Sequence, residues 1–187
     1  MRDEATFRVD GWNKAEGIAL KAFGAIAFAC LTILSAQIRI PLPFTPVPMT
    51  LQTFVVPLAG GFLGTLWGGA SMLLYLGLGI VGLNVFASAS GGLEFFLAPT
   101  AGYLVGYFFA ATLVGLARDL SRSNLLLLAA LVLSHIVIFV CGVVGLVWNA
   151  GMSGAEAFTK GVAPFLVGDS IKITASFLVL LSYRKLS

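Results

Sequence analysis

Charged residues are scarce in this sequence. Asp, Glu, Lys and Arg make up 10% of its 187 residues, whereas 59% are apolar, and an ordinary soluble domain carries about 25% charged residues. A chain of this length cannot hide so much apolar surface in one aqueous core, because small domains keep a large share of their surface exposed. The composition therefore predicts an all-α integral membrane protein, with one transmembrane domain over residues 1–187 and lipid as its solvent.

Other shortages exclude further classes of protein. The basic residues are scattered, so they form no clustered face for nucleic acid. Cys30 and Cys141 lie inside apolar runs and His135 is the single histidine, so we expect buried packing residues and no metal site. The sequence has no G-x-x-x-x-G-K-[ST] loop for ATP, and no H-E-x-x-H or G-x-S-x-G arrangement. We therefore expect neither an enzyme nor a bound cofactor.

Apolar runs predict six transmembrane helices. The expected spans are about 18–38, 49–64, 67–82, 100–117, 125–148 and 164–181. The second and third spans share a 34-residue run, which is too long for one crossing and short for two, because one crossing takes about 20 residues. We expect two short helices there, with a turn near residues 64–69. The polar residues before the first span lack the pattern of a signal peptide.

Two segments between the spans are predicted to be non-helical. Residues 41–48 contain four prolines, and each proline lacks an N–H and restricts the residue before it. Residues 83–94 are rich in Gly and Ser. Non-helical backbone at membrane depth must be covered by protein or line a cavity, so the second segment is expected to fold back into the protein.

The distribution of Lys and Arg predicts the orientation. Six spans place both termini on one side of the membrane, together with most of the basic residues. That side holds Arg2, Arg8, Lys14, Lys21, Arg118, Arg122, Arg184 and Lys185, while Arg39 and Lys160 fall on the other side. By the positive-inside rule both termini are cytoplasmic, in the cell membrane, and the proline-rich segment lies outside.

Asp169 and Lys172 are the sharpest candidates for function. Ionisable groups in a span are costly, so they are expected to face protein or a cavity, and a spacing of three puts both on one helix face. They could be a mutually neutralising packing pair or could line a polar pocket open to the outside. We favour the pocket, because a pair kept only for packing is replaceable by apolar residues.

Other residues allow two interpretations each. Gln52 could cap a helix or face the pocket. Ser90 likewise could have a structural role or face the pocket, and Tyr103 could stack on a ligand or merely pack. Ala25 and Ala29 are four apart in the first span, a spacing of small residues that allows close helix approach. They could serve internal packing or form a surface for a partner protein.

Several motifs along the chain form one pattern: residues 40–53, Gly82-Leu83, Val85-Phe86-Ala87, Ser90-Gly91-Gly92, residues 99–103, and Gly168-Asp169 with Lys172. Together they resemble the BioY family, the biotin-binding subunits (S-components) of energy-coupling-factor (ECF) transporters, and the resemblance covers nearly the whole chain. The chain departs from the family pattern at Asn84, Ser90, Ala101 and Leu104.

This resemblance implies six helices, with loops capping a biotin site that faces outward. It implies that Asp169 and Lys172 contact biotin and that Ser90 reaches the ureido ring. We expect Gln52, Tyr103 and Gly91 to complete the site. The resemblance also implies a coupling protein with ATPases as partners, docked on the surface of Ala25 and Ala29, and leaves room for a homo-oligomer. A structural or assembly protein without ligand and a proton-coupled carrier remain the alternatives.

Overall fold

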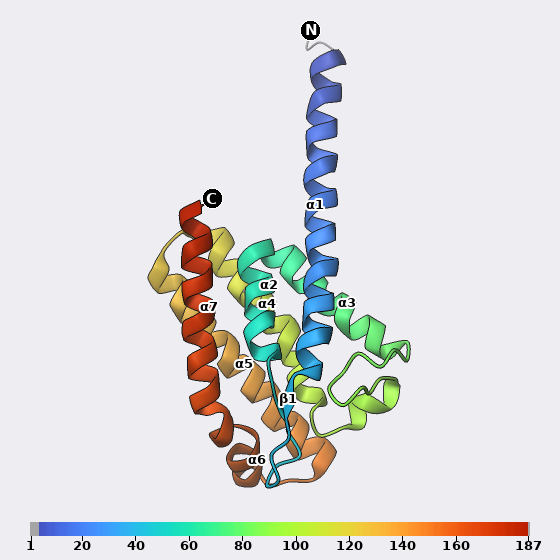
Figure 1. Ribbon diagram of the computed structural model, residues 1–187, viewed down its shortest axis with the longest axis vertical. Helices are drawn as coiled ribbons and strands as arrows, with labels where there is room; N and C mark the ends of the chain where they lie inside the picture. The colour runs from blue at the N-terminus through green and yellow to red at the C-terminus, as the bar shows by residue number, and fades with distance from the viewer. Residues whose placement is uncertain (1–3, 187) are drawn as a thin grey trace.

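A computed structural model describes the backbone of residues 4–186 and the side chains of residues 17–95 and 97–186. It is a bundle of helices with irregular segments gathered at one end (Figure 1). The longest helices are α1 (Glu4–Gln37), α4 (Ala101–Leu120), α5 (Asn124–Ala150) and α7 (Leu166–Leu186). The shorter ones are α2 (Gln52–Leu63), α3 (Thr65–Ile80) and α6 (Gly154–Gly161).

Length and composition divide the helices into two groups. Within the described residues, four helical stretches are long and apolar enough to cross a membrane: Gly17–Gln37, Ala101–Leu120, Asn124–Ala150 and Gly154–Leu186. The apolar helices α2 and α3 are shorter, as the sequence predicted. Large apolar side chains lie exposed around the bundle, among them Phe23 at 70% and Leu125 at 77%. Exposed apolar surface on this scale indicates a protein that contacts lipid.

Gly64 makes the turn between the two short helices. Its φ is +85°, a left-handed value that glycine adopts without steric cost. The Asp119 carboxylate at the end of α4 then accepts hydrogen bonds from the backbone N–H of Thr65 at 2.8 Å and from its hydroxyl at 2.7 Å. An acid at this position satisfies a free N–H and suits the positive end of the helix dipole. The break therefore falls within the region predicted for it.

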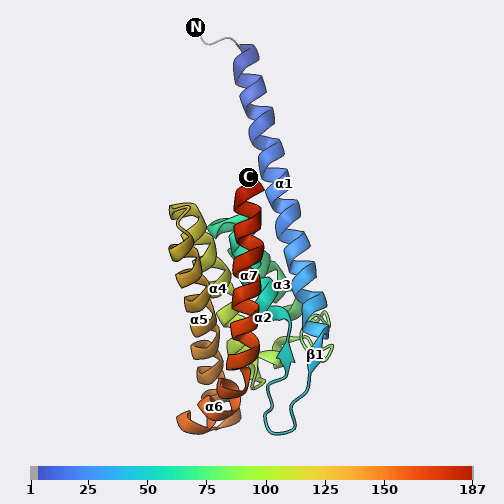
Figure 2. The same ribbon diagram turned by 60° about the vertical axis from the view of Figure 1, so that its left-hand side comes forward.

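The segments predicted to be non-helical lie at the opposite end of the bundle from the end of α7 (Figure 2). The proline-rich segment is the loop of a hairpin, in which β1 (Arg39–Ile40) pairs antiparallel with β2 (Met49–Thr50). Residues 83–94 fold back, with a bridge between Phe86 and Ser90, and lead into a 3₁₀ helix at Leu93–Leu97. Phe86 is fully buried, so this loop is anchored in the bundle.

The helices extend beyond the predicted spans in two places, although the first apolar span, Gly17–Gln37, agrees with the predicted 18–38. Helix α1 begins at Glu4, well before the apolar run, because the polar residues ahead of it continue the helix. The short helix α6 was not predicted; its Ser153 side chain accepts a hydrogen bond from the N–H of Glu156 and caps it. The N-terminal end of α1 and the C-terminal end of α7 point toward the same end of the bundle (Figure 1), in keeping with an even number of crossings.

Candidate ligand-binding site

A pocket opens among α2, α4, α5 and α7 near the hairpin and the Gly/Ser loop. Its empty volume is about 530 Å³, which includes space open to solvent. One part of its wall is apolar and aromatic, made by Val47, Pro48, Ala87, Phe95, Leu104, Phe139 and Phe165. The polar part is made by Thr50, Gln52, Thr53, Thr100, Tyr103, Tyr107, Asp169 and Lys172. Such a wall suits a small ligand with an apolar body and polar groups.

Asp169, Lys172 and Thr53 form one hydrogen-bonded cluster on this wall. Lys172 Nζ donates to Asp169 Oδ1 at 2.7 Å and to the Thr53 hydroxyl at 2.8 Å. The Thr53 hydroxyl in turn donates to Asp169 Oδ1 at 2.9 Å. The side chains of Asp169 and Lys172 are 5% and 14% exposed. A buried ion pair of this kind needs further hydrogen bonds to offset desolvation, and the cluster supplies them.

Lys172 and Asp169 differ in how many of their hydrogen-bonding atoms have partners in the protein. Lys172 Nζ also donates to the Thr50 carbonyl at 2.8 Å, so its three N–H donors all have protein partners. Both hydrogen bonds to Asp169 reach Oδ1, and Oδ2 has no partner among the described residues. The free acceptor at this edge of the pocket is therefore a carboxylate oxygen, which suits an N–H group of a ligand.

Gln52 lies in a second chain of hydrogen bonds. It is 2% exposed, its amide donates to the Tyr75 hydroxyl at 2.8 Å, and its oxygen accepts from Tyr107 at 3.4 Å and Thr50 at 3.3 Å. The amide thus links α2 to α3 and α4 at the base of the pocket. Gln52 therefore faces the pocket. Among the described residues its side chain makes no capping hydrogen bond at the start of α2, so the capping interpretation is not supported.

Tyr103 lines the pocket and also ties two distant parts of the chain together. Its hydroxyl donates to the Gly161 carbonyl at 2.7 Å, at the end of α6. The ring is 7% exposed. Tyr103 therefore presents its ring to the pocket while its hydroxyl holds the segment that leads into α7 and Asp169.

Ser90 and Gly91 do not line the pocket, in contrast to the prediction; their neighbour Ala87 does. The Ser90 hydroxyl donates to the Ala87 carbonyl at 2.8 Å, and the Ser90 carbonyl accepts from the Phe86 N–H at 2.9 Å. A Cβ at Gly91 would lie 2.1 Å from the Leu83 carbonyl oxygen. In this structure the two residues shape the loop, and any contact with a ligand remains a prediction.

Ala25 and Ala29 do not form an exposed docking surface, in contrast to the prediction. The two side chains are 5% and 1% exposed, because they lie on the face of α1 that packs against α2 and α3. Their small size serves internal packing, which was the other interpretation. The exposed face of the same helix carries large apolar residues, including Phe23 and Ile26.

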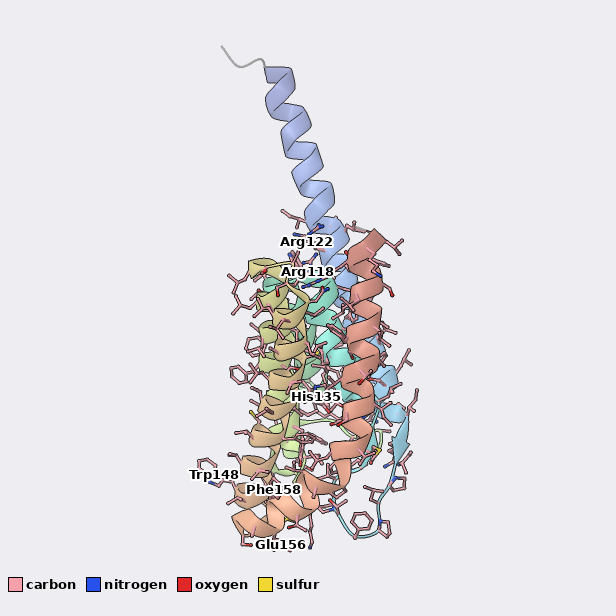
Figure 3. The ribbon with its side chains drawn as sticks, turned by 90° about the vertical axis from the view of Figure 1, so that its left-hand side faces the viewer. Arg118, Arg122, His135, Trp148, Glu156 and Phe158 are labelled. Atoms are coloured by element: carbon pink, nitrogen blue, oxygen red, sulfur yellow. The ribbon has the colours of Figure 1, made fainter. Side chains whose placement is uncertain are left out.

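His135 lies buried in α5, midway along the bundle (Figure 3). Its Nδ1 is 2.9 Å from the Leu131 carbonyl oxygen, while Nε2 has no hydrogen-bond partner among the described residues. The histidine is thus only half satisfied. No group of three His, Cys, Asp or Glu side chains that could hold a metal occurs in the part of the chain that the structure describes.

Several pocket residues escaped the sequence argument. Phe139 and Phe165 look like ordinary apolar residues of a span, and only the packing of α5 and of the 3₁₀ turn before α7 turns them toward the pocket. Tyr75, which lies outside the pocket lining and accepts a hydrogen bond from Gln52, gives no signal in the sequence either. Thr53 is a polar residue beside Gln52 at the start of the second span, but its bonds to Asp169 and Lys172 were not predicted.

The chain is similar to known proteins along nearly its whole length. The model of the BioY family matches residues 12–187. A probable biotin transporter BioY of Pyrococcus horikoshii is 37% identical over 167 residues, covering 89% of this chain and 94% of that protein. The biotin transporter BioY of Thermotoga maritima is 36% identical over 160 residues, covering 85% of this chain and 92% of that protein.

A solved structure has the same fold. The crystal structure of the S-component for biotin from an ECF-type ABC transporter superposes with a TM-score of 0.80 at 27% identity, covering 92% of this chain and 93% of that one. The fold is thus that of an S-component, in a multi-pass membrane protein. By the extent of the family match and of these identities, the chain belongs to the BioY family.

Proposed function

We propose that this protein captures biotin at the membrane and delivers it inward, as a transport subunit and not as an enzyme. The observation that carries the proposal is the cluster of Asp169, Lys172 and Thr53 on one wall of an otherwise largely apolar pocket. Relatives of this chain are biotin transporters. The same pocket weighs against a purely structural protein, because packing alone does not need an internal space bordered by a buried ion pair.

The chemistry of biotin fits the two parts of the pocket wall. The ureido ring carries two N–H donors and one acceptor, and Asp169 Oδ2 is the free acceptor at the polar edge. The ring system and the alkyl chain are apolar and match the aromatic wall of Phe95, Phe139 and Phe165. Desolvated N–H groups bound to a carboxylate form strong, charge-assisted hydrogen bonds. We therefore place the ureido ring at Asp169, with Gln52 and Tyr103 shaping the site.

The orientation and the partners are part of the same proposal. The distribution of Lys and Arg places the end of α7 in the cytoplasm and the pocket toward the outside. The sequence has no loop of its own for ATP. We therefore propose an energy-coupling membrane protein with two ATPases as partners, and assembly of this chain into homo-oligomers is a separate possibility to test by mass measurement in detergent.

Equilibrium binding of radiolabelled biotin to the purified protein tests the function directly. We expect saturable binding at one site per chain, competed by unlabelled biotin. Absence of binding to the folded wild-type protein would overturn the substrate. The proton-coupled alternative predicts biotin uptake into vesicles that lack any ATPase and respond to a proton gradient, and the proposal predicts no such uptake.

A further inference from the structure

A second pocket lies at the other end of the bundle, between the turn at Gly64, the turn that joins α4 to α5, and the end of α7. Its empty volume is about 690 Å³, and it is lined by Gly61, Arg118, Asp119, Arg122, Tyr183 and Arg184. Arg118 and Arg122 lie at this end, while Trp148 and Glu156 lie at the opposite end (Figure 3). The pocket is therefore separate from the candidate biotin site.

The charges in this pocket do not balance. Three guanidinium groups face a single carboxylate, that of Asp119. This carboxylate is already occupied at the start of α3, where it accepts hydrogen bonds from Thr65 at 2.8 and 2.7 Å. Its contact with Arg118 is longer, at 3.5 Å. The pocket thus keeps a positive charge that an anion could neutralise.

Arg184 is held in place by neutral acceptors. Its guanidinium donates to the carbonyl oxygens of Arg122 at 3.1 Å, Ser123 at 3.2 Å and Ser121 at 3.5 Å. These bonds fix the end of α7 against the turn between α4 and α5 but leave the charge of Arg184 uncompensated. Among the described side chains, the Arg122 guanidinium has no hydrogen-bond or ion-pair partner. The pocket therefore offers donors in a partly fixed arrangement.

Guanidinium groups recognise phosphate oxygens through paired, charge-assisted hydrogen bonds. The pocket lies where α4 and α7 end and α5 begins, and helices that cross an apolar core of about 30 Å bring such ends to the headgroup region. Basic pockets between transmembrane helices on the cytoplasmic side are suited to anionic headgroups. We propose that this arginine pocket (Arg118, Arg122 and Arg184) binds a phosphate group, supplied by an anionic phospholipid of the adjoining leaflet.

Native mass spectrometry of the delipidated full-length protein tests the proposal, with phosphatidylglycerol and phosphatidylcholine of the same acyl chains as probes. We expect the wild type to retain phosphatidylglycerol in preference to phosphatidylcholine. Arg122→Gln should weaken this retention about fivefold, and the Arg118→Gln/Arg122→Gln double variant about 25-fold, as expected for about 1 kcal/mol per basic residue. Arg122→Lys keeps the charge but loses the paired donors, so its loss of retention should be smaller than that of Arg122→Gln and still measurable.

Lys185→Gln is the matched control, because Lys185 is exposed, adjoins Arg184 and does not line the pocket. It should change retention less than twofold. Equal retention by wild type and double variant, or an equal loss in Lys185→Gln, would overturn the site. A further arm adds inorganic phosphate against chloride at equal ionic strength. Displacement of the lipid by phosphate would support the same site with a soluble phosphate as an additional source, and no displacement would support the lipid alone.

Discussion

Lys172 Nζ lies 2.7 Å from Asp169 Oδ1, one helical turn away on α7, and both atoms contact the Thr53 hydroxyl of α2. The ion pair is therefore tied across two helices and does not depend on α7 alone. Because Lys172 uses its three donors inside the protein, we expect it to act in binding by orienting Asp169. We expect Asp169 to make the direct contact with a ligand.

Asp169→Asn removes the charge while keeping the shape of the side chain. It leaves the Lys172 ammonium buried without a counter-ion, and it exchanges a charged acceptor for a neutral one. A hydrogen bond to a charged group contributes about 1.5–3 kcal/mol, so biotin affinity should fall about 10- to 100-fold. Equilibrium binding of radiolabelled biotin measures this loss, with a thermal unfolding scan alongside to show that the variant is folded.

Glu156→Gln provides the control for that experiment. Glu156 also pairs with a lysine on its own helix, Lys160 at 2.8 Å, but both side chains are about 40% exposed, at 44% and 39%. Exposed pairs contribute about 0–1 kcal/mol, so this variant should bind biotin as the wild type does. Wild-type affinity in Asp169→Asn would remove Asp169 from the site.

Thr53→Val tests the bridge between the two helices. Valine matches threonine in shape but cannot accept from Lys172 or donate to Asp169. Removing one partner of a buried polar group costs about 1–3 kcal/mol, so both the unfolding temperature and the biotin affinity should fall. Thr53→Ser keeps the hydroxyl and should retain most of both. A loss in Thr53→Ser together with wild-type values in Thr53→Val would show that the methyl group, and not the hydroxyl, matters.

Tyr103→Phe tests the tie between α4 and α6. The change leaves the Gly161 carbonyl without its 2.7 Å hydrogen bond, and should lower stability by about 1–2 kcal/mol. Amide hydrogen exchange across α6 should increase as a local consequence. Tyr107→Phe is the comparison, because its hydroxyl makes only a 3.4 Å bond to Gln52 and its loss should leave α6 exchange unchanged. Unaltered exchange in both variants would contradict this role of Tyr103.

The sequence was sufficient for features that depend on composition and local chemistry. The low charge content predicted the membrane fold, the prolines predicted the break at residues 41–48, and the spacing of Asp169 and Lys172 predicted their shared face. Features that depend on tertiary packing were beyond it. The burial of Ala25 and Ala29 depends on which face of α1 meets α2 and α3. The aromatic wall depends on the rotation of α5 and on the two 3₁₀ turns that carry Phe95 and Phe165.

The same distinction explains Ser90 and Gly91. Their Gly/Ser-rich context correctly predicted irregular backbone, but the direction of each side chain depends on the bridge between Phe86 and Ser90 and on the contact with Leu83. No local pattern encodes such a contact. The resemblance implied that Ser90 reaches the ligand and we expected Gly91 beside it, whereas in this structure Ala87 lines the pocket and the other two do not.

Gly91→Ala tests whether this loop closes the biotin site. The added Cβ would lie 2.1 Å from the Leu83 carbonyl oxygen and 2.7 Å from its carbon, and backbone atoms cannot yield as a side chain can. Overpacking of this kind costs about 1–3 kcal/mol. The loop must then move together with Ala87, so biotin should dissociate faster, by about tenfold or more. Dissociation of radiolabelled biotin after dilution measures the rate.

Gly77→Ala is the matched control, because a Cβ there meets nothing within 4 Å and alanine favours the helix by up to about 1 kcal/mol. A wild-type dissociation rate in Gly91→Ala would mean that the loop does not hold the ligand, since the substitution cannot be accommodated without displacing the loop.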